Sequence, residues 1–207
     1  MTPIILIFLK APRPGQVKTR LAKSVGVHDA RRIYKTLVDR QLGRLPNNCP
    51  VTVVFTPADA EAEMRAWLGG DYGFFPQPDG DLGRRLRLSI ARAFDAGASP
   101  VIAIGGDCPG LGAGHIKRAG QLLETGEDVV LGPTEDGGYY LIGLRQPRPG
   151  LFADIPWSTG ETCAATREKA ASMGLRLAQL DALYDVDTEA DRQRAVRDGF
   201  LPEIEKA

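Results

Sequence analysis

Acidic side chains are missing from the start of this sequence, and basic side chains are missing from a stretch near its end. No aspartate or glutamate precedes Asp29, and no lysine or arginine lies between Arg176 and Arg192. The formal net charge of the 207 residues is zero, so bulk attraction to nucleic acid or to an anionic membrane is not indicated. Charge-based binding must therefore be local, and a cationic segment paired with an acidic one suits a polyphosphate and its metal ion.

Cysteine is also scarce, and long apolar runs are absent. The three cysteines, Cys49, Cys108 and Cys163, form no Cys-x-x-Cys pair, which argues against a disulfide framework and a zinc site. The apolar run from Pro3 to Leu9 is too short for a bilayer span and lacks a basic leader, so it indicates a strand. We therefore expect a cytoplasmic protein without a nucleic-acid or membrane partner, and leave homodimer formation open.

Short apolar runs alternate with amphipathic segments along the chain. The expected strands are Ile4–Leu9, Val51–Phe55, Val101–Ile104, Val129–Leu131 and Tyr139–Leu144. The expected helices are Ala30–Leu45, with Asp29 as its cap, and Asp59–Leu68, Leu82–Phe94, Gly114–Leu123, Glu161–Met173 and Glu189–Arg197. This alternation predicts a three-layer α/β fold with a mostly parallel sheet, in one domain over residues 1–207.

The central strand ends in Gly105-Gly106-Asp107, two glycines followed by one carboxylate. Ligands of open parallel sheets bind beyond the carboxyl ends of the strands, and glycine lets the backbone approach a ligand closely. Asp107 is therefore a candidate site residue. The alternative is that it caps the helix that begins near Gly112.

The first loop joins a strand to a helix and carries several cations. It reads Lys10-Ala-Pro-Arg-Pro-Gly-Gln-Val-Lys18-Thr-Arg20, and contains neither a Walker A motif nor a Gly-x-Gly-x-x-Gly motif. Cations beside free backbone N–H groups favour phosphate binding. We expect Lys18 and Arg20 to bind phosphate, with Lys10 as a further candidate; the alternative is a solvated basic turn.

Three further loops carry acidic residues that have both a functional and a purely structural interpretation. Asp81 lies between Gly80 and Gly83 and could cap the following helix. Asp136-Gly137 precedes an aromatic strand and could be a hairpin turn. Asp185 and Asp187 alternate in an extended segment, so both carboxylates could face one Mg²⁺, although Asp187 or Thr188 could also cap the last helix.

With these loops in order, the sequence resembles the glycosyltransferase-A-like (GT-A) superfamily of nucleotide-diphospho-sugar transferases. The resemblance is to its small bacterial members, which are similar to phospholactate guanylyltransferase, and it extends from about Ile4 to Arg194. The segments that carry it are Lys10–Leu21, Gly80–Arg84, Gly105–Pro109, Asp136–Tyr140, Trp157–Thr159 and Asp185–Thr188. It implies a Rossmann-like GT-A fold.

The resemblance also implies the roles of individual residues. Nucleotide binding is expected at Lys10, Pro12, Gly15, Lys18, Arg20, Gly80, Asp81, Gly83 and Gly106. Acceptor binding is expected at Asp136, Gly137, Gly138, Tyr139, Trp157 and Thr159. Asp107 is expected to bind Mg²⁺ or Mn²⁺ together with Asp187 or, as a second choice, Asp185.

Together these observations predict a metal-dependent nucleotidyltransferase. Lys18, Arg20 and Asp107 would carry the catalysis, as a phosphorylated small-molecule acceptor attacks a nucleoside triphosphate and pyrophosphate leaves. Gly105 stands where sugar transferases usually carry the first aspartate of an Asp-x-Asp motif, which favours nucleotidyl over glycosyl transfer. The alternatives are a glycosyltransferase that uses a nucleotide-sugar and a non-catalytic nucleotide-binding protein.

Overall fold

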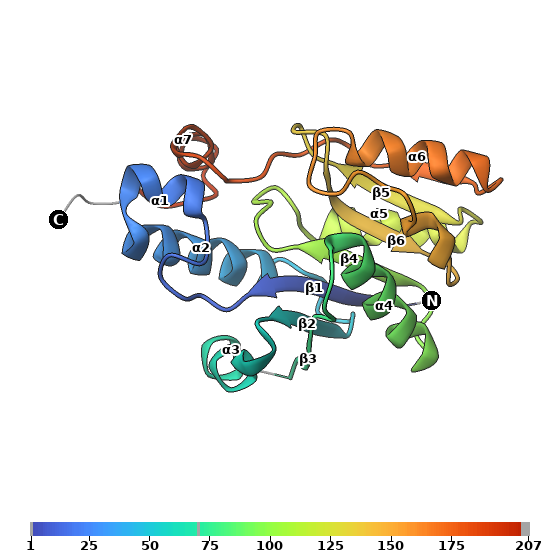
Figure 1. The fold of residues 1–207 in the computed structure, drawn as a ribbon, viewed down its shortest axis with the longest axis horizontal. Coiled ribbons are helices and arrows are strands. Elements are labelled where there is room, and N and C mark those ends of the chain that lie inside the picture. Colours follow the sequence, from blue (N-terminus) through green and yellow to red (C-terminus); the bar gives the residue numbers. More distant parts are fainter. Residues whose placement is uncertain (1, 70, 204–207) are drawn as a thin grey trace.

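The computed structural model describes residues 2–69 and 71–203, which form a seven-stranded sheet with helices on both faces (Figure 1). The strands are β1 (Ile4–Lys10), β2 (Val51–Thr56), β3 (Gly73–Pro76), β4 (Val101–Gly105), β5 (Val129–Pro133), β6 (Tyr139–Leu144) and β7 (Leu177–Gln179). Their order is β3-β2-β1-β4-β6-β5-β7. All neighbouring strands are parallel except the two pairs that involve β6, which confirms the predicted mostly parallel sheet.

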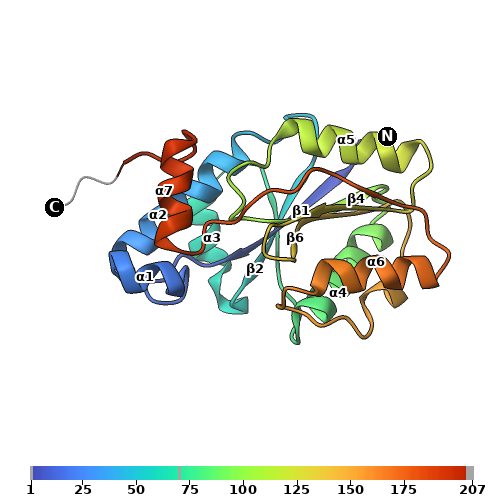
Figure 2. The ribbon, with the colours of Figure 1, turned by 90° about the horizontal axis from the view of Figure 1, so that it is seen from above.

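The helices divide between the two faces of this sheet. They are α1 (Thr19–Val25), α2 (Val27–Leu42), α3 (Glu61–Leu68), α4 (Leu82–Asp95), α5 (Ala113–Glu124), α6 (Thr162–Ser172) and α7 (Glu189–Arg197), with short 3-10 turns η1 (Ala58–Ala60) and η2 (Pro149–Phe152). Helices α2, α3 and α5 contribute to one buried cluster, whereas α4 and α6 contribute to the other. Figure 2 shows α5 on one side of the sheet and α4 and α6 on the other. The predicted three layers are therefore confirmed.

Burial of both faces explains the sequence of the central strands. In β1, Ile5 and Ile7 pack in one cluster and Leu6 in the other, and all three are at most 1% exposed. Central parallel strands covered on both sides are uninterrupted apolar runs rather than alternating ones. Because β1, β2 and β4 are parallel neighbours, the loops that follow them meet at one edge of the sheet.

Four elements differ from the sequence-based expectation. The edge strands β3 and β7 were not predicted, because each is only three or four residues long and β3 contains a glycine and a proline. Helix α1 was interpreted as part of the first loop. Helix α2 begins at Val27 after Gly26 rather than at Ala30, so Asp29 lies in its first turn and the prediction that Asp29 caps it was wrong.

A third apolar cluster joins the two ends of the described chain. Leu21 of α1 and Ile33 of α2 pack with Tyr184, Val186 and Ala195. This cluster holds the extended segment before α7 against the first two helices, and that segment carries Asp185 and Asp187. Within residues 2–69 and 71–203, no helix combines the length and the apolar character that a membrane crossing needs.

Candidate active site

A cavity of about 560 Å³ opens at the carboxyl edge of the sheet. Its wall is formed by the ends of β1 and β4, the first loop, the start of α4, the start of β6 and the segment before α7. The volume is typical of a small-molecule site. Of the sequence-predicted residues, the cavity is lined by Lys10, Lys18, Arg20, Gly106, Asp107, Tyr139 and Asp187.

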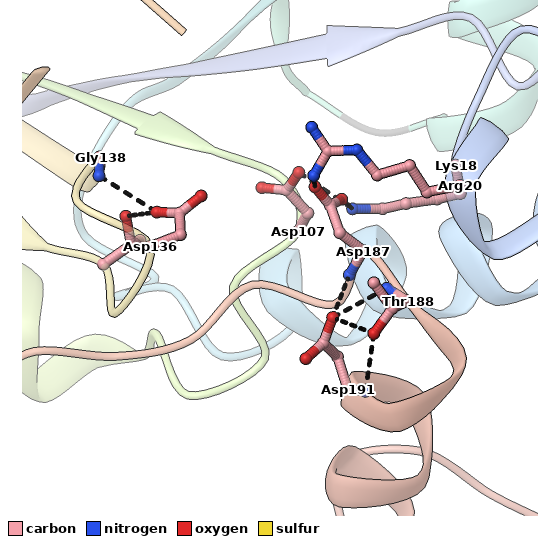
Figure 3. Close-up of polar contacts among 9 residues, drawn as sticks. Lys18, Arg20, Asp107, Asp136, Gly138, Asp187, Thr188 and Asp191 are labelled. Carbon is pink, nitrogen blue, oxygen red and sulfur yellow. Dashed lines mark hydrogen bonds and ion pairs between the residues drawn. The ribbon is translucent and has the colours of Figure 1, made fainter. Parts of the chain in front are cut away.

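Lys18 joins the two aspartates that the sequence places far apart. Its Nζ lies 3.0 Å from Asp107 Oδ2 and 2.9 Å from Asp187 Oδ1, and Arg20 Nη1 lies 3.4 Å from the other oxygen of Asp187 (Figure 3). The Lys18 side chain is only 4% exposed, whereas those of Asp107 and Asp187 are 41% and 40% exposed. The carboxylates thus face the cavity, and the ammonium is buried behind them.

The backbone of Lys18 has a conformation that few residues with a side chain adopt. Lys18 precedes the first turn of α1 with φ +48° and ψ +47°, the left-handed region that favours glycine. Such strain persists where surrounding contacts over-determine it, and here the two ion pairs supply those contacts. The left-handed turn aims the side chain at Asp107 and Asp187 instead of at solvent.

The charges in this cluster alter one another's pKa values. Burial lowers the pKa of Lys18, but the attraction of Asp107 and Asp187 outweighs it and the pKa is raised. Burial raises the pKa of Asp187, but the charge of Lys18 and its hydrogen bond outweigh that effect and the pKa is lowered. Both shifts favour the ionised pair.

Asp185 lies beside this pair without joining it. Burial, reinforced by the negative charge of Asp107, raises the pKa of Asp185 to about 8. Its Oδ1 is buried and has no hydrogen-bond partner in the described part of the chain. A buried oxygen of this kind needs a donor or a cation.

The carboxylate oxygens of this cluster are ligands of the type that a hard divalent cation binds, because Mg²⁺ prefers one or two carboxylates together with substrate phosphates. Asp107 and Asp187 provide such carboxylates, and the orphaned oxygen of Asp185 is a third candidate. Among residues 2–69 and 71–203, no three His, Cys, Asp or Glu side chains already form a metal-binding group. The ammonium of Lys18 instead bridges the two carboxylates.

The rest of the first loop is divided between the cavity and the surface. Lys10 lines the cavity, and its backbone is fixed by the hydroxyl of Tyr34, which accepts from the Lys10 N–H and donates to its carbonyl. Arg13 instead pairs with Glu63 of α3 at 2.9 Å. Pro12 and Gly15 do not line the cavity; Gly15 has φ +76°, which glycine adopts readily.

The Gly80–Gly83 turn starts α4 rather than lining the cavity. Asp81 caps this helix, since its Oδ1 accepts a hydrogen bond of 2.8 Å from the backbone N–H of Arg84. Asp107, by contrast, caps no helix, because α5 begins after Gly112. Gly80, Asp81 and Gly83 thus contribute the turn that positions the first residues of α4, and Leu82, Arg85 and Leu86 of that helix reach the cavity.

The predicted acceptor side is a hairpin tip packed against a loop. Asp136 stabilises the tip, because its Oδ1 accepts from Thr134 Oγ1 at 2.6 Å and from the Gly138 N–H at 3.1 Å (Figure 3). Gly137 has φ +90°, and a β-carbon there would overlap the carbonyl of Gly160. Asp136, Gly137 and Gly138 therefore shape the hairpin and do not themselves line the cavity.

The loop that follows η2 is fixed mainly by contacts outside the cavity. Trp157 stacks on Phe152, with ring centroids 6.3 Å apart, and Thr159 Oγ1 donates to the Pro156 carbonyl at 2.8 Å. Neither Trp157 nor Thr159 lines the cavity. Ser158 between them does, with φ +62°.

Sequence reasoning missed Gln77, Arg85 and Ser158 as cavity residues. Their sequence signals were weak: Arg85 is one of two adjacent arginines on an amphipathic helix, and Ser158 stands in an ordinary Ser-Thr-Gly turn. Gln77 is a single glutamine after a short, unpredicted strand, which gives no signal of its own.

Comparison with known proteins extends this description. The sequence pattern of the family described as "Uncharacterized protein conserved in bacteria (DUF2064)" matches residues 41–159. A 3-phospho-D-glycerate guanylyltransferase from Phenylobacterium zucineum is 28% identical over 148 residues, which cover 70% of this chain and 66% of that protein. The matched segment is therefore slightly shorter than two thirds of this relative.

Solved structures share the fold. A crystal structure from Desulfovibrio desulfuricans G20, described as a nucleotide-diphospho-sugar transferase, has a TM-score of 0.89 and 34% identity, covering 96% of this chain and 88% of the other. The manganese complex of Rv0371C from Mycobacterium tuberculosis has a TM-score of 0.57 and 17% identity, covering 95% and 99%. The fold of this chain is that of the GT-A-like nucleotide-diphospho-sugar transferases.

Proposed function

Since this chain belongs to the DUF2064 family, and shares a GT-A-like fold with nucleotide-diphospho-sugar transferases, we propose that it is a transferase that moves a nucleoside monophosphate from a nucleoside triphosphate to a phosphorylated small molecule. One observation carries the proposal: the cations of Lys18 and Arg20 and the carboxylates of Asp107 and Asp187 converge on one cavity wall. Polyphosphate binding needs the cations, and a bridging metal ion needs the carboxylates.

In the proposed reaction, a phosphate oxygen of the acceptor attacks the α-phosphorus of the nucleotide. A new P–O bond forms, the bond between the α-phosphorus and the bridging oxygen breaks, and pyrophosphate leaves with that electron pair. The protein supplies no nucleophile, so its contribution is to position the reactants and to stabilise the developing charge.

Each residue of the cluster has a defined task in this proposal. Lys18 and Arg20 donate hydrogen bonds to the phosphate oxygens. Asp107 and Asp187 would hold Mg²⁺ or Mn²⁺, with Asp185 as a third candidate ligand. When bound, the metal would neutralise charge on the phosphates. For the ammonium of Lys18 to reach a phosphate, its two carboxylate contacts must be exchanged for that phosphate.

The acceptor would enter from the side of Tyr139 and Ser158, which also line the cavity. The guanylyltransferase relative supports GTP as the nucleotide and a small phosphorylated acid as the acceptor. We propose both as the substrates to test first.

Glycosyl transfer from a nucleotide-sugar is the second candidate. It is favoured by the 34% identity to the Desulfovibrio protein that is described as a nucleotide-diphospho-sugar transferase. The same carboxylates and cations would then stabilise a leaving nucleoside diphosphate rather than pyrophosphate.

A thermal-shift screen followed by product analysis separates these proposals. The protein is mixed with each nucleoside triphosphate, diphosphate and common nucleotide-sugar, with and without Mg²⁺. A ligand at 100 times its dissociation constant should stabilise the fold by about 2.7 kcal/mol. A metal-dependent shift with a triphosphate, and pyrophosphate release with 3-phosphoglycerate or another phosphorylated acid, supports nucleotidyl transfer.

The other outcomes count against the proposal. A shift with nucleotide-sugars alone, followed by release of a nucleoside diphosphate, favours glycosyl transfer. If none of the nucleotides shifts the melting temperature, with or without candidate acceptors, the chain does not use this cavity for nucleotides.

A further inference from the structure

The guanidinium of Arg85 is fixed at the wall of the cavity by two acceptors from the protein. Its Nε donates to the Gly80 carbonyl at 2.8 Å and its Nη1 donates to Gln77 Oε1 at 3.3 Å. Within the described residues, no protein acceptor is bound to its Nη2. Arg85 therefore brings an oriented group with remaining N–H donors to the cavity.

Gln77 is anchored so that it can hold Arg85 but offer little to a ligand. Its Nε2 donates to the carbonyls of Leu9 in β1 and Val54 in β2, at 3.2 and 3.0 Å. Its backbone N–H donates to the carbonyl of Phe55 at 2.6 Å. Both amide donors of this side chain are thus used by the strand ends, and its oxygen is left for Arg85.

Apolar side chains flank Arg85 on the same face of α4. Leu82, Arg85 and Leu86 are three and four residues apart, a spacing that places side chains together on a helix, and all three line the cavity. Leu82 is 40% exposed, which is unusual for a leucine in this protein. Apolar side chains beside the guanidinium of Arg85 suit a flat, partly polar ring such as a nucleobase.

The hydrogen-bonding chemistry of the Arg85 guanidinium restricts which base can bind. A guanidinium offers donors and no acceptor, so its partner must present acceptors. Guanine presents O6 and N7 side by side, which match an arginine fork, whereas adenine places an amino donor at the corresponding position. A 6-amino purine would leave an N–H of Arg85 facing another donor.

We propose that Arg85 reads the base of the nucleotide and selects guanine over adenine, with Gln77 as the residue that positions it. This inference rests on the proposed nucleotidyl transfer and assigns its donor substrate. It places the base at the start of α4, beside the ends of β1, β2 and β3, and leaves the region of Tyr139 and Ser158 for the acceptor.

Binding measurements on the whole chain test the assignment. Calorimetry with Mg²⁺ compares GTP, ATP, ITP and 7-deaza-GTP for wild type, Arg85→Met, Gln77→Met and Arg84→Met. Arg84 is the matched control, because it also donates its Nε to a backbone carbonyl, that of Asp79 at 3.0 Å, but does not line the cavity.

Wild type and Arg84→Met should prefer GTP over ATP by roughly 10- to 100-fold, the discrimination typical of one bidentate contact to a base. ITP keeps O6 and N7 and should bind nearly as well as GTP. 7-Deaza-GTP lacks the N7 acceptor and should bind more weakly. Arg85→Met should lose most of the preference for GTP and become insensitive to N7, and Gln77→Met should lose part of the preference.

Several outcomes would overturn the assignment. If Arg85→Met still binds GTP and the ratio of its affinities for GTP and ATP is unchanged, Arg85 does not recognise the base, while the proposed function stands. An equal loss of GTP and ATP shows that Arg85 binds phosphate instead. If wild type binds no nucleoside triphosphate, the proposed function itself fails. If Arg85→Met does not fold, Arg85→Lys replaces it. An undiminished preference for GTP over ATP in Arg85→Lys would also contradict the assignment.

Discussion

The indole ring of Trp157 lies against Gly83 so closely that a β-carbon on this glycine would overlap the ring. Gly83 is the second residue of α4, at the predicted nucleotide side, whereas Trp157 belongs to the loop on the predicted acceptor side. The ring is fixed from behind by Phe152 and Tyr139, each with its ring centroid 6.3 Å away. The start of α4 and the loop that follows η2 are thus in direct contact.

Replacing Gly83 by alanine should destabilise the protein by about 1 to 3 kcal/mol, the usual cost of overpacking. Gly114→Ala is the control, since Gly114 is also the second residue of its helix, α5, and no atom lies within 4 Å of the added carbon. That variant should gain about 0.5 to 1 kcal/mol. Urea unfolding measures both. Equal free energies of unfolding for Gly83→Ala and Gly114→Ala would contradict the contact between Gly83 and Trp157. In a Trp157→Ala background, the cost of Gly83→Ala should disappear.

Asp107→Asn should keep the fold and lose activity. We expect the rate of nucleotidyl transfer to fall roughly 10³-fold, which corresponds to about 4 kcal/mol of transition-state stabilisation, because the substitution removes a charge that faces the cavity. Steady-state pyrophosphate release measures the rate, and Asp95→Asn, at the exposed end of α4, is the control. A rate within a few-fold of wild type would remove Asp107 from the site.

Lys18→Met should change metal and nucleotide binding in opposite directions. Without nucleotide, Mn²⁺ should bind about tenfold more tightly, or by about 1.4 kcal/mol, because no ammonium competes for Asp107 and Asp187. The affinity for the nucleotide should fall, because the proposed contact of Lys18 with a phosphate is lost. Paramagnetic resonance of free Mn²⁺ measures the first effect. Lys23→Met, on the exposed face of α1, should change neither, and unaltered Mn²⁺ affinity in Lys18→Met would argue against the competition.

Asp128 provides a prediction about pH and stability. Its carboxylate accepts from the Arg176 N–H at 3.1 Å and from the guanidinium groups of Arg145 and Arg148 at 3.2 and 3.1 Å, and the hydrogen bond from Arg176 is the main reason that its pKa is lowered. Asp128→Asn should cost about 1 to 2 kcal/mol at neutral pH.

The sign of the pH dependence follows from the lowered pKa. The folded protein favours the ionised form of Asp128, so the stabilisation is complete above its ordinary pKa of about 3.9 and is lost as pH falls through the lower folded value. The difference in unfolding free energy between wild type and Asp128→Asn should therefore shrink from pH 5 towards pH 3. A difference that grows in acid would contradict this.

Local patterns predicted the framework of the fold because they follow directly from burial. The apolar runs of β1, β2 and β4 and the Asp-Gly turn before β6 are visible in any short window of sequence. The edge strand β7 is not, since its three residues are only partly buried and its pairing with β5 requires the rest of the sheet. Similarly, no window reveals that Gly26 allows α2 to begin three residues earlier than predicted.

The site was predictable in its charges and less so in its shape. The uneven distribution of charge singled out Lys18, Arg20 and Asp187, the strand that ends in two glycines singled out Asp107, and the fold brings the four together. Their proposed roles, the metal and the one-domain organisation stay predictions. Arg85 could not be told apart from Arg84, because only the paired ends of β1 and β2 hold Gln77 where it selects one of them.

The ion pair between Lys18 and Asp187 joins residues 169 positions apart. During synthesis, the first loop and the central strand leave the ribosome long before the segment that carries Asp187. Domains fold largely as units as they emerge, so a nascent chain that already contains Asp107 still lacks one of the partners that hold Lys18 in place. The proposed ability to bind nucleotide should therefore arise late in synthesis, and a chain that ends before Asp187 should lack it.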